Sequence, residues 1–290
     1  MSEMKTILVT GTSGMIGSSV AKKLLENGHK VIGVDRCEGK IQHENYTHII
    51  IDLAVASDVI GVFENSNADR VIHLAAVAHA FSNGKITWED YYTANVLSAR
   101  NVFIAASQKK IPTLFISTAD VYGFTKGTVD AATTPEPVSN YAKSKVLAEK
   151  ELIEICREFG SEFDIFRFAP VYTDEIKRDI QKRYYLKYPD IAYIIGDGTG
   201  YEFLNINVAV DRMAEWAQND PQNTIHNIKN EKLINTAECL EEEIEAGRAK
   251  HVLHFPKWLV RFGFGIIFCL TGKNKYTYLL GKAVNPIRTK

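Results

Sequence analysis

Neither sign of charge dominates this sequence. Its 290 residues include 34 Lys and Arg against 35 Asp and Glu, so the formal net charge is −1. A chain with this balance has no overall basic field to attract nucleic acid or an anionic lipid surface. Any anionic ligand must therefore be held by local features.

Cysteine is scarce as well. The four cysteines are far apart and form no C-x-x-C pair, and no histidine cluster lies near them: Cys37, Cys156, Cys239 and Cys269. This spacing favours neither a metal site nor a disulfide framework. It fits a protein of the reducing cytoplasm.

Long apolar runs are also missing. The first run, TILVTG, begins at Thr6 without the features of an export signal, so we expect no export. The apolar segment 258–272 contains Arg261 and is shorter than the roughly 20 residues of a membrane span. Two interpretations stay open for 258–272. The more ordinary one is a packed helix or lid, and the other is a helix in the membrane interface that makes peripheral contact.

The sequence does contain a regular alternation of short β-branched runs and longer segments of helical period. Strands are predicted at 6–10, 30–34, 48–51, 70–75, 113–117 and 164–169, and helices at 15–27, 55–65, 89–109 and 139–159. Apolar strands joined by crossover helices predict a parallel sheet covered on both faces. We therefore expect an α/β, doubly wound Rossmann domain over residues 1–169, with ligands beyond the carboxyl ends of its strands.

The alternation ends after Ala169, and residues 170–290 are expected to form a smaller, mixed substrate-binding lobe. In this part, 173–189 predicts a charged helix, 191–206 two strands around a Gly-rich turn, and 208–218 another helix. Segments near 203–217 are candidates to return to the main sheet.

A glycine-rich turn follows the first strand. VTGTSGMIGSSV places Gly11, Gly14 and Gly17 where they permit a tight turn, approach of backbone N–H groups to a pyrophosphate, and close packing of helix and strand. Asp35 ends the second strand, where its carboxylate can accept hydrogen bonds from an adenosine ribose. Asp35 would repel a 2′-phosphate and favours NAD, whereas the neighbouring Arg36 could bind that phosphate and leaves NADP open.

Tyr141 and Lys145 are four residues apart at the start of a predicted helix, so they share one face. A phenolate at neutral pH needs its pKa of about 10 lowered by about 3, roughly 4 kcal/mol. The Lys145 ammonium is placed to supply part of this stabilisation and to bond the nicotinamide ribose. A Tyr with an i+4 Lys is common on protein surfaces, so the pair alone identifies no enzyme.

The chain resembles the extended short-chain dehydrogenase/reductase superfamily, the branch of nucleotide-sugar epimerases, dehydratases and reductases. The resemblance covers residues 5–172 and rests on TGTSGMIG, Asp35, HLAA (73–76), STADVYG (117–123) and Tyr141-x-x-x-Lys145. It implies that Tyr141 is the acid/base, that Lys145 lowers its pKa and holds ribose, and that Thr118 bonds the reacting oxygen. The cofactor-binding residues that it implies are Gly11, Ser13, Gly14, Met15, Ile16, Gly17, Asp35, Arg36, Asp52, Leu53, Leu74, Ala75, Ala76, Asn95, Tyr141 and Lys145.

The same resemblance narrows the chemistry. A sugar carbon gives a hydride to nicotinamide while the Tyr removes the hydroxyl proton, and return of the hydride to the opposite face of the sugar gives the epimer. Dehydratases of this branch need an acid and a base beside the Thr, usually Asp-Glu. Here the pair is Ala119-Asp120, which argues against dehydration. Asp120 is thus either a catalytic or a structural residue, and His79, past the fourth strand, is a further catalytic or substrate candidate with the same structural alternative.

At two positions where family members contact the substrate, this chain has different residues. Members that bind UDP- or dTDP-sugars carry Asn where this chain has Pro170, and an Arg for the diphosphate where it has Tyr201 and Glu202. The cations that could replace that Arg are Lys177, Arg178, Lys182 and Arg183, although such a run is more often a solvated face.

We therefore expect an NAD-dependent epimerase of a nucleotide sugar. The alternative is a reductase or dehydrogenase of a nucleotide keto-sugar or other bulky alcohol. A nucleotide-sensing protein without catalysis is a third hypothesis, against which the retention of Tyr141 and Lys145 argues. The resemblance also implies a homodimer through the helices at 89–109 and 139–159.

Overall fold

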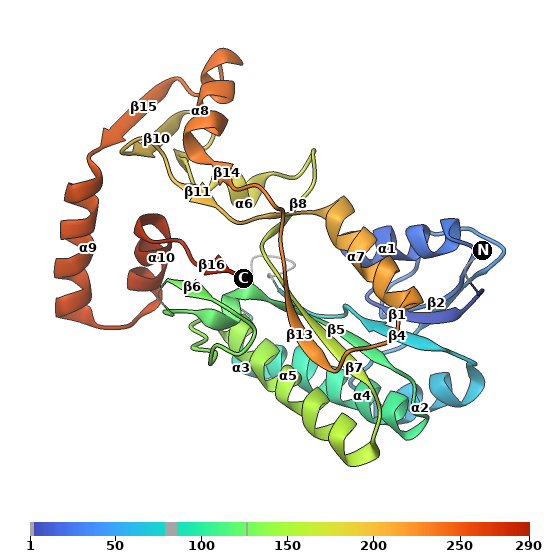
Figure 1. The fold of residues 1–290 in the computed structure, drawn as a ribbon. Helices are drawn as coiled ribbons and strands as arrows, with labels where there is room; N and C mark the ends of the chain where they lie inside the picture. Colours follow the sequence, from blue (N-terminus) through green and yellow to red (C-terminus); the bar gives the residue numbers. More distant parts are fainter. Residues whose placement is uncertain (1–2, 79–85, 126) are drawn as a thin grey trace. The chain divides into compact units, whose positions relative to one another are not determined.

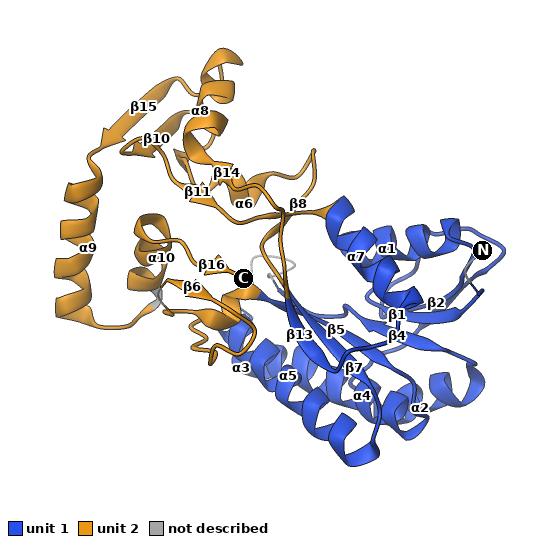
Figure 2. Ribbon diagram, in the orientation of Figure 1, with its two compact units in different colours: residues 1–118, 140–167, 207–226 blue, residues 119–139, 168–206, 227–290 orange. Residues whose placement is uncertain are grey.

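The computed structural model describes residues 3–78, 86–125 and 127–290. Figure 1 shows the course of the chain, and Figure 2 colours its two compact units. Unit 1 comprises Met1–Thr118, Asn140–Arg167 and Asn207–His226, and unit 2 comprises Ala119–Ser139, Phe168–Ile206 and Asn227–Lys290. The chain therefore crosses between the units several times.

A seven-stranded sheet forms the centre of unit 1, with the strand order β13-β7-β5-β4-β1-β2-β3. The pairs β1–β2, β2–β3, β1–β4 and β4–β5 are all parallel. The strands are β1 (Thr6–Thr10), β2 (Lys30–Asp35), β3 (Tyr46–Ile50), β4 (Arg70–His73), β5 (Thr113–Thr118), β7 (Phe163–Phe168) and β13 (Thr224–Ile228). The predicted doubly wound α/β fold is confirmed.

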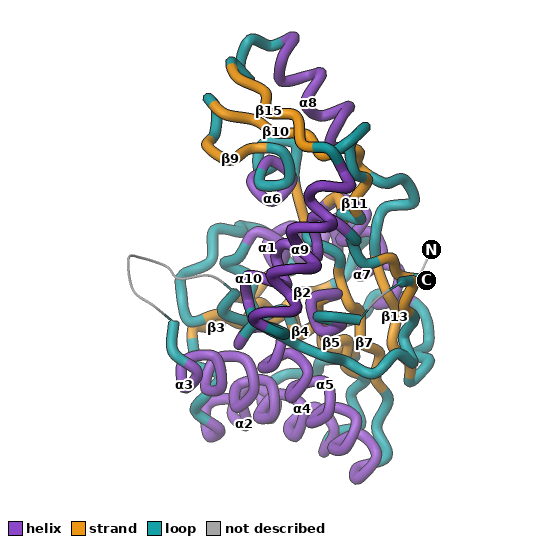
Figure 3. Tube along the Cα trace, turned by 90° about the vertical axis from the view of Figure 1, so that its left-hand side faces the viewer, coloured by secondary structure: helices purple, strands orange, loops and turns teal. Residues whose placement is uncertain are grey.

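Helices cover both faces of this sheet (Figures 1 and 3). On one face lie α1 (Met15–Glu26) and α7 (Ile206–Gln218), which are joined by the ion pair between Lys23 and Asp211 at 2.9 Å. On the other face lie α2 (Ala56–Asn65), α4 (Ser98–Gln108) and α5 (Asn140–Phe159). The core under this second layer includes Phe103, Phe115 and Leu152, each fully buried. Strands that are apolar on both sides thus remove a large nonpolar area from water.

Unit 2 is built from short elements. Its three-stranded sheet has the order β15-β10-β9, and the other strands pair as β11–β14, β12–β8 and β16–β6. These strands are β6 (Thr128–Val129), β8 (Val171–Tyr172), β9 (Tyr185–Lys187), β10 (Ile191–Ile195), β11 (Gly200–Tyr201), β12 (Leu204–Asn205), β14 (Ile234–Asn235), β15 (His251–Phe255) and β16 (Arg288–Thr289). The helices are α6 (Arg178–Gln181), α8 (Thr236–Glu245), α9 (Lys257–Thr271) and α10 (Lys275–Val284). Of the described helices, none has both the length and the apolarity to cross a bilayer.

The prediction of a helix over 173–189 is wrong. Only Arg178–Gln181 is helical there, and Tyr185–Lys187 forms β9, antiparallel to β10. Tyr184 and Tyr185 are buried in a core that also contains Phe203 and Leu240. Burial of two neighbouring aromatic rings therefore outweighs the helical charge pattern of this segment.

The units also differ from the single predicted boundary between residues 169 and 170. Residues 119–139, which follow β5, belong to unit 2, and residues 207–226, with α7 and most of β13, belong to unit 1. Pairing of β13 beside β7 brings this late segment back to the main sheet. Such pairing depends on contacts that are remote in sequence.

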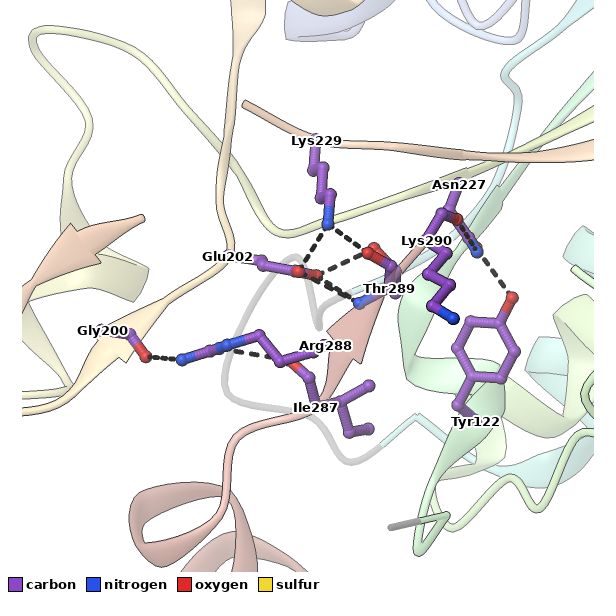
Figure 4. A network of polar contacts seen from close by, with 9 residues as sticks. All are labelled: Tyr122, Gly200, Glu202, Asn227, Lys229, Ile287, Arg288, Thr289 and Lys290. Carbon is purple, nitrogen blue, oxygen red and sulfur yellow. Dashed lines mark hydrogen bonds and ion pairs between the residues drawn. The ribbon is translucent and has the colours of Figure 1, made fainter. Parts of the chain in front are cut away.

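The C-terminal strand of unit 2 is held by a polar network (Figure 4). The Glu202 carboxylate accepts hydrogen bonds from Lys229 Nζ at 2.7 Å and from the backbone and hydroxyl of Thr289 at 3.0 and 2.9 Å. Asn227 accepts from the Tyr122 hydroxyl at 2.7 Å and donates to the Lys290 carbonyl at 3.0 Å. Glu202 and Tyr122 therefore have structural partners within this unit.

Candidate active site

Four of the predicted site residues lie at the ends of parallel strands of unit 1 or directly after them. Gly11 follows β1, Asp35 ends β2, Leu74 follows β4 and Thr118 ends β5. Because these strands point the same way, the residues lie along one carboxyl edge of the sheet. The fold thus brings together residues that are far apart in the sequence.

The glycine turn has the shape that a pyrophosphate requires. Gly11 has φ +80°, and a Cβ there would lie 2.9 Å from the Ala75 nitrogen. A Cβ on Gly17 would lie 2.1 Å from the Gly11 carbonyl oxygen. Gly14 caps α1 without a side-chain hydrogen bond and is exposed, so the first turn of α1 presents its N–H groups to a ligand. These residues fit the diphosphate of a dinucleotide.

Asp35 is held beside this turn. Its carboxylate accepts hydrogen bonds from the Ser13 N–H at 2.9 Å and the Cys37 N–H at 3.1 Å. Two carboxylate oxygens have about four acceptor positions, so capacity remains for ribose hydroxyls. On the next loop, Asp52 is exposed and accepts from the Ala54 N–H at 2.9 Å.

The HLAA segment is fixed by the buried pair of Thr10 and His73. The Thr10 hydroxyl accepts from the N–H groups of Leu74 and Ala75 at 3.2 and 3.1 Å and lies 2.9 Å from His73 Nδ1. Because the Thr10 oxygen accepts two hydrogen bonds, its own proton is the one donated to His73 Nδ1. His73 Nδ1 is therefore the acceptor, and the ring proton of His73 is on Nε2. Burial, with the charge of Lys145, lowers the pKa of His73 to about 3. His73 is therefore a neutral structural residue.

Lys145 reaches from α5 to the end of β5. Its Nζ donates to the Ile116 carbonyl at 2.7 Å and lies 4.5 Å from the centre of the Phe115 ring. Burial lowers the pKa of Lys145 to about 7, against the opposing effect of Glu149. An ammonium has three donors, so two remain for a ligand at this strand end.

Tyr141 lies one turn before Lys145 on α5 and is half-buried. Its ring centre is 6.5 Å from that of Tyr91. Its carbonyl accepts from the Ser144 hydroxyl at 2.8 Å, and that hydroxyl accepts from Asn95 Nδ2 at 2.9 Å. The helix that carries the acid/base candidate is thus bonded to a neighbouring helical segment.

Asn95 lies in a π-helical turn, Tyr92–Leu97, which precedes α4. Its amide also pairs with Val77, accepting from the N–H at 2.7 Å and donating to the carbonyl at 3.0 Å. The family resemblance places Asn95 among the cofactor-binding residues. The described contacts run to Ser144, next to Lys145, and to the chain after β4. A π-turn inside a helix often occurs at functional sites.

A buried ion pair behind Lys145 was not predicted from the sequence. Arg167 on β7 donates to both oxygens of Glu149 at 3.0 and 2.6 Å, and Ser117 on β5 donates to the same carboxylate at 2.5 Å. Two signals point to it: Glu149 is four residues after Lys145 on the same face, and a charged residue inside the apolar strand 163–168 needs a partner. The pair fixes α5 to two strands.

Asp120 belongs to unit 2 and has structural partners. Its carboxylate forms an ion pair with Lys282 at 2.5 Å and accepts from the Tyr278 hydroxyl at 3.2 Å. Burial raises the pKa of Asp120, but Lys282 and Tyr278 more than compensate and hold it below its usual value. Both partners lie on α10. His79, the other candidate, lies outside the described residues.

Comparison with known proteins adds to this geometry. The sequence profile of the NAD dependent epimerase/dehydratase family matches residues 7–188, more than half of the chain. The chain belongs to that family. Membership confirms the resemblance drawn from the sequence motifs, and the family's NAD dependence agrees with the predicted cofactor.

Individual relatives are more distant. The uncharacterised UDP-glucose epimerase YtcB of Bacillus subtilis (strain 168) is 30% identical over 189 residues, which are 60% of this chain and 59% of that protein. The UDP-glucuronate 4-epimerase of Thermodesulfobacterium geofontis (strain OPF15) is 27% identical over 210 residues, 66% of this chain and 65% of the relative. The matched part thus spans less than two thirds of either relative.

A solved structure supports the fold over a longer range. The UDP-glucuronic acid 4-epimerase of Bacillus cereus, crystallised with NAD, superposes with a TM-score of 0.69. The alignment covers 86% of this chain and 87% of that one at 22% identity. At this identity the likeness establishes the Rossmann fold alone.

Proposed function

We propose that this protein is an NAD-dependent 4-epimerase of a nucleotide sugar. One observation carries the proposal: a family match over residues 7–188 that includes Tyr141 and Lys145 on one face of α5, with Lys145 buried against the end of β5. Relatives and structural neighbours named as UDP-sugar 4-epimerases support it.

The dinucleotide would be held by residues of unit 1. The N-terminus of α1 and the turn Gly11–Gly14 would bind its diphosphate, and Asp35 would accept from the adenosine ribose. The segment Leu74–Ala76 would line the adenosine, with Asp52 at the adenine edge. When bound, NAD supplies reversible acceptance of a hydride from the sugar carbon.

The remaining chemistry belongs to three side chains. Tyr141 takes the proton of the sugar hydroxyl and later returns it, which requires a lowered phenol pKa. The Lys145 ammonium favours the phenolate and bonds ribose hydroxyls. Thr118 donates to or accepts from the reacting oxygen. If the oxidised sugar turns its other face toward the nicotinamide before the hydride and the proton are returned, the C4 epimer forms.

For the diphosphate of the substrate we propose Arg183. Its guanidinium lies 5.1 Å from the centre of the Tyr201 ring. By the family resemblance, Tyr201 and Glu202 stand where other members commonly carry the Arg that binds the diphosphate. Its Nε is buried without a hydrogen-bond partner among the described residues. Arg183→Gln should raise KM for the sugar nucleotide at least tenfold and spare NAD affinity, whereas Lys182→Gln, on the exposed ion pair with Asp179, should change neither.

A homodimer is proposed from family resemblance. The helices concerned, α4 and α5, pack against each other and carry the ion pair between Arg100 and Glu151 at 3.4 Å. Sedimentation equilibrium distinguishes a dimer from a monomer directly. A strict monomer at micromolar concentration would refute the assembly and leave the proposed chemistry untouched.

Turnover with UDP-glucose and UDP-glucuronate tests the function. Purified protein should interconvert C4 epimers without added cofactor and without accumulation of free NADH. Tyr141→Phe should abolish turnover and keep NAD, whereas Tyr91→Phe, a neighbouring phenol whose ring centre is 6.5 Å away, should retain turnover. Stoichiometric NADH release would favour the dehydrogenase alternative instead.

A further inference from the structure

An apolar stripe runs along the exposed side of α9. Trp258, Phe262, Ile266 and Leu270 follow one another at intervals of four residues, so they lie on one side of the helix. They are 69%, 64%, 46% and 78% exposed, and no residue of α9 is buried. A soluble surface rarely gathers four large apolar side chains in this way.

The opposite side of α9 packs within unit 2. Phe264 and Phe268 are half-buried, with ring centres 5.7 Å apart, and the Phe268 ring is 6.3 Å from that of Phe124. Helix α10 also contacts α9 (Figure 1). Figure 3 looks onto α9, and no other segment of unit 2 covers it in that view. The helix is therefore anchored on one side and presents the stripe on the other.

The chain segment that contains the stripe carries charge of one sign. Residues 246–290 contain no Asp or Glu but nine cations: Arg248, Lys250, Lys257, Arg261, Lys273, Lys275, Lys282, Arg288 and Lys290. The other 245 residues then hold 25 Lys and Arg against 35 Asp and Glu, a net charge of −10. The net charge of −1 for the whole chain therefore conceals a basic C-terminal segment and an acidic remainder.

Some of these cations have acidic partners, but those on α9 do not. Lys273 pairs with Glu136 at 2.7 Å, and Lys282 pairs with Asp120. Lys257 and Arg261 are exposed and make no ion pair with any described residue. Two free cations thus lie on the helix that carries the stripe.

We propose that α9 docks this protein on an anionic membrane surface. The helix lies in the plane of the interface, with Trp258, Phe262, Ile266 and Leu270 inserted among the lipids and Lys257 and Arg261 at the anionic headgroups. Its 15 residues measure roughly 22 Å, less than the roughly 30 Å of a bilayer core, which agrees with a helix that lies along the surface. Tyr276 and Leu279 of α10, 75% and 51% exposed, extend the contact.

A lipid surface fits these features better than a protein groove. An exposed stripe of Trp, Phe, Ile and Leu, on a helix whose only charged residues are basic, is typical of interfacial helices. The docking requires no turnover, so it stands apart from the proposed epimerase activity.

Vesicle sedimentation with the full chain tests the proposal. The wild type should sediment with vesicles that contain phosphatidylglycerol, much less with pure phosphatidylcholine, and less at high salt. Phe262→Glu should lower the bound fraction by at least about tenfold. The matched control is Leu186→Glu, because Leu186 is 62% exposed elsewhere in unit 2 and should be dispensable.

A second measurement places the helix in the bilayer. Brominated phospholipids should quench the fluorescence of Trp258, and Trp258→Phe should remove that quenching. Failure of the wild type to sediment with either vesicle, or equal binding by Phe262→Glu, would overturn the proposal. A wild-type dimer that Phe262→Glu dissociates, with no vesicle binding, would assign the stripe to a second copy of the chain and would also overturn it.

Discussion

Burial of the charged Lys145 ammonium destabilises the folded protein, and this effect depends on pH. Its pKa of about 7 in the folded protein compares with about 10.4 in an unfolded chain. Between these values the unfolded chain holds a proton that the folded protein has lost, so the stability contributed by this residue rises with pH. Below pH 7 both states are protonated and the cost is constant.

The variant Lys145→Met should remove this pH dependence. In urea unfolding of the ligand-free protein, the wild type should gain a few kcal/mol relative to the variant as pH rises from about 7 to about 10. The hydrogen bond from Nζ to the Ile116 carbonyl changes the size of the stability difference between wild type and variant. It does not change how that difference varies with pH. A difference in stability that is independent of pH would contradict the assigned pKa.

The two polar residues after β5 should behave differently when replaced. Thr118→Val should lower kcat roughly a hundredfold, because the reacting oxygen loses a hydrogen bond. Asp120→Asn should keep most activity and lose about 1–3 kcal/mol of stability, because it breaks the ion pair with Lys282. Steady-state kinetics and urea unfolding separate these effects. Equal activity of both variants and the wild type would refute the role of Thr118.

The sequence predicts the position of a single site residue only where that residue belongs to a local motif. The spacing of Tyr141 and Lys145 places them on one helical face, and α5 has that geometry. Glu149 is on the same face but needs Arg167 from β7, and no local pattern pairs residues on a helix and a later strand. Asp120 and Lys282 are likewise remote in sequence. Such partners become apparent only in the fold.

Among the secondary-structure elements, α5 is attached to β7 by the Glu149–Arg167 pair, and we expect this pair to affect the free energy of unfolding. Glu149→Gln leaves Arg167 buried without a charged partner and should cost about 3–5 kcal/mol. Replacing both by Met should cost less, since no unpaired charge remains. Urea unfolding of the single and double variants makes the comparison. A double variant less stable than Glu149→Gln would contradict the argument.

The same pair should affect catalysis through Lys145. Glu149 raises the pKa of Lys145, so its neutralisation should deprotonate the ammonium at lower pH. The alkaline limb of kcat/KM should therefore move to lower pH in Glu149→Gln. An unchanged limb would assign Glu149 a purely structural role.

Strands and crossover helices of unit 1 follow the predicted ranges closely, because apolar runs and helical periods are local signals. Unit 2 follows them less well. Its short strands pair with remote segments, as β16 does with β6, and Tyr184 and Tyr185 are placed by core packing. The π-helical turn at Tyr92–Leu97 also lies inside what sequence predicts as one continuous helix.

At the scale of the whole molecule, composition averages conceal the distribution of charge. A total of −1 suggests no electrostatic partner, yet the last 45 residues contain nine cations and no acid. The same segment carries the exposed stripe of α9. The catalytic candidates Thr118, Tyr141 and Lys145 all belong to unit 1, so chemistry and membrane docking are assigned to different units.

The proposed epimerase returns to the sugar the same hydrogen that it removes. The direct measurement uses a UDP-sugar deuterated at C4, incubated with the wild type and analysed by mass spectrometry and NMR. We expect the C4 epimer to form with its deuterium retained, and Tyr141→Phe to form no epimer while still binding NAD. An epimer that has exchanged its deuterium for solvent hydrogen, or turnover by Tyr141→Phe equal to wild type, would contradict the proposal.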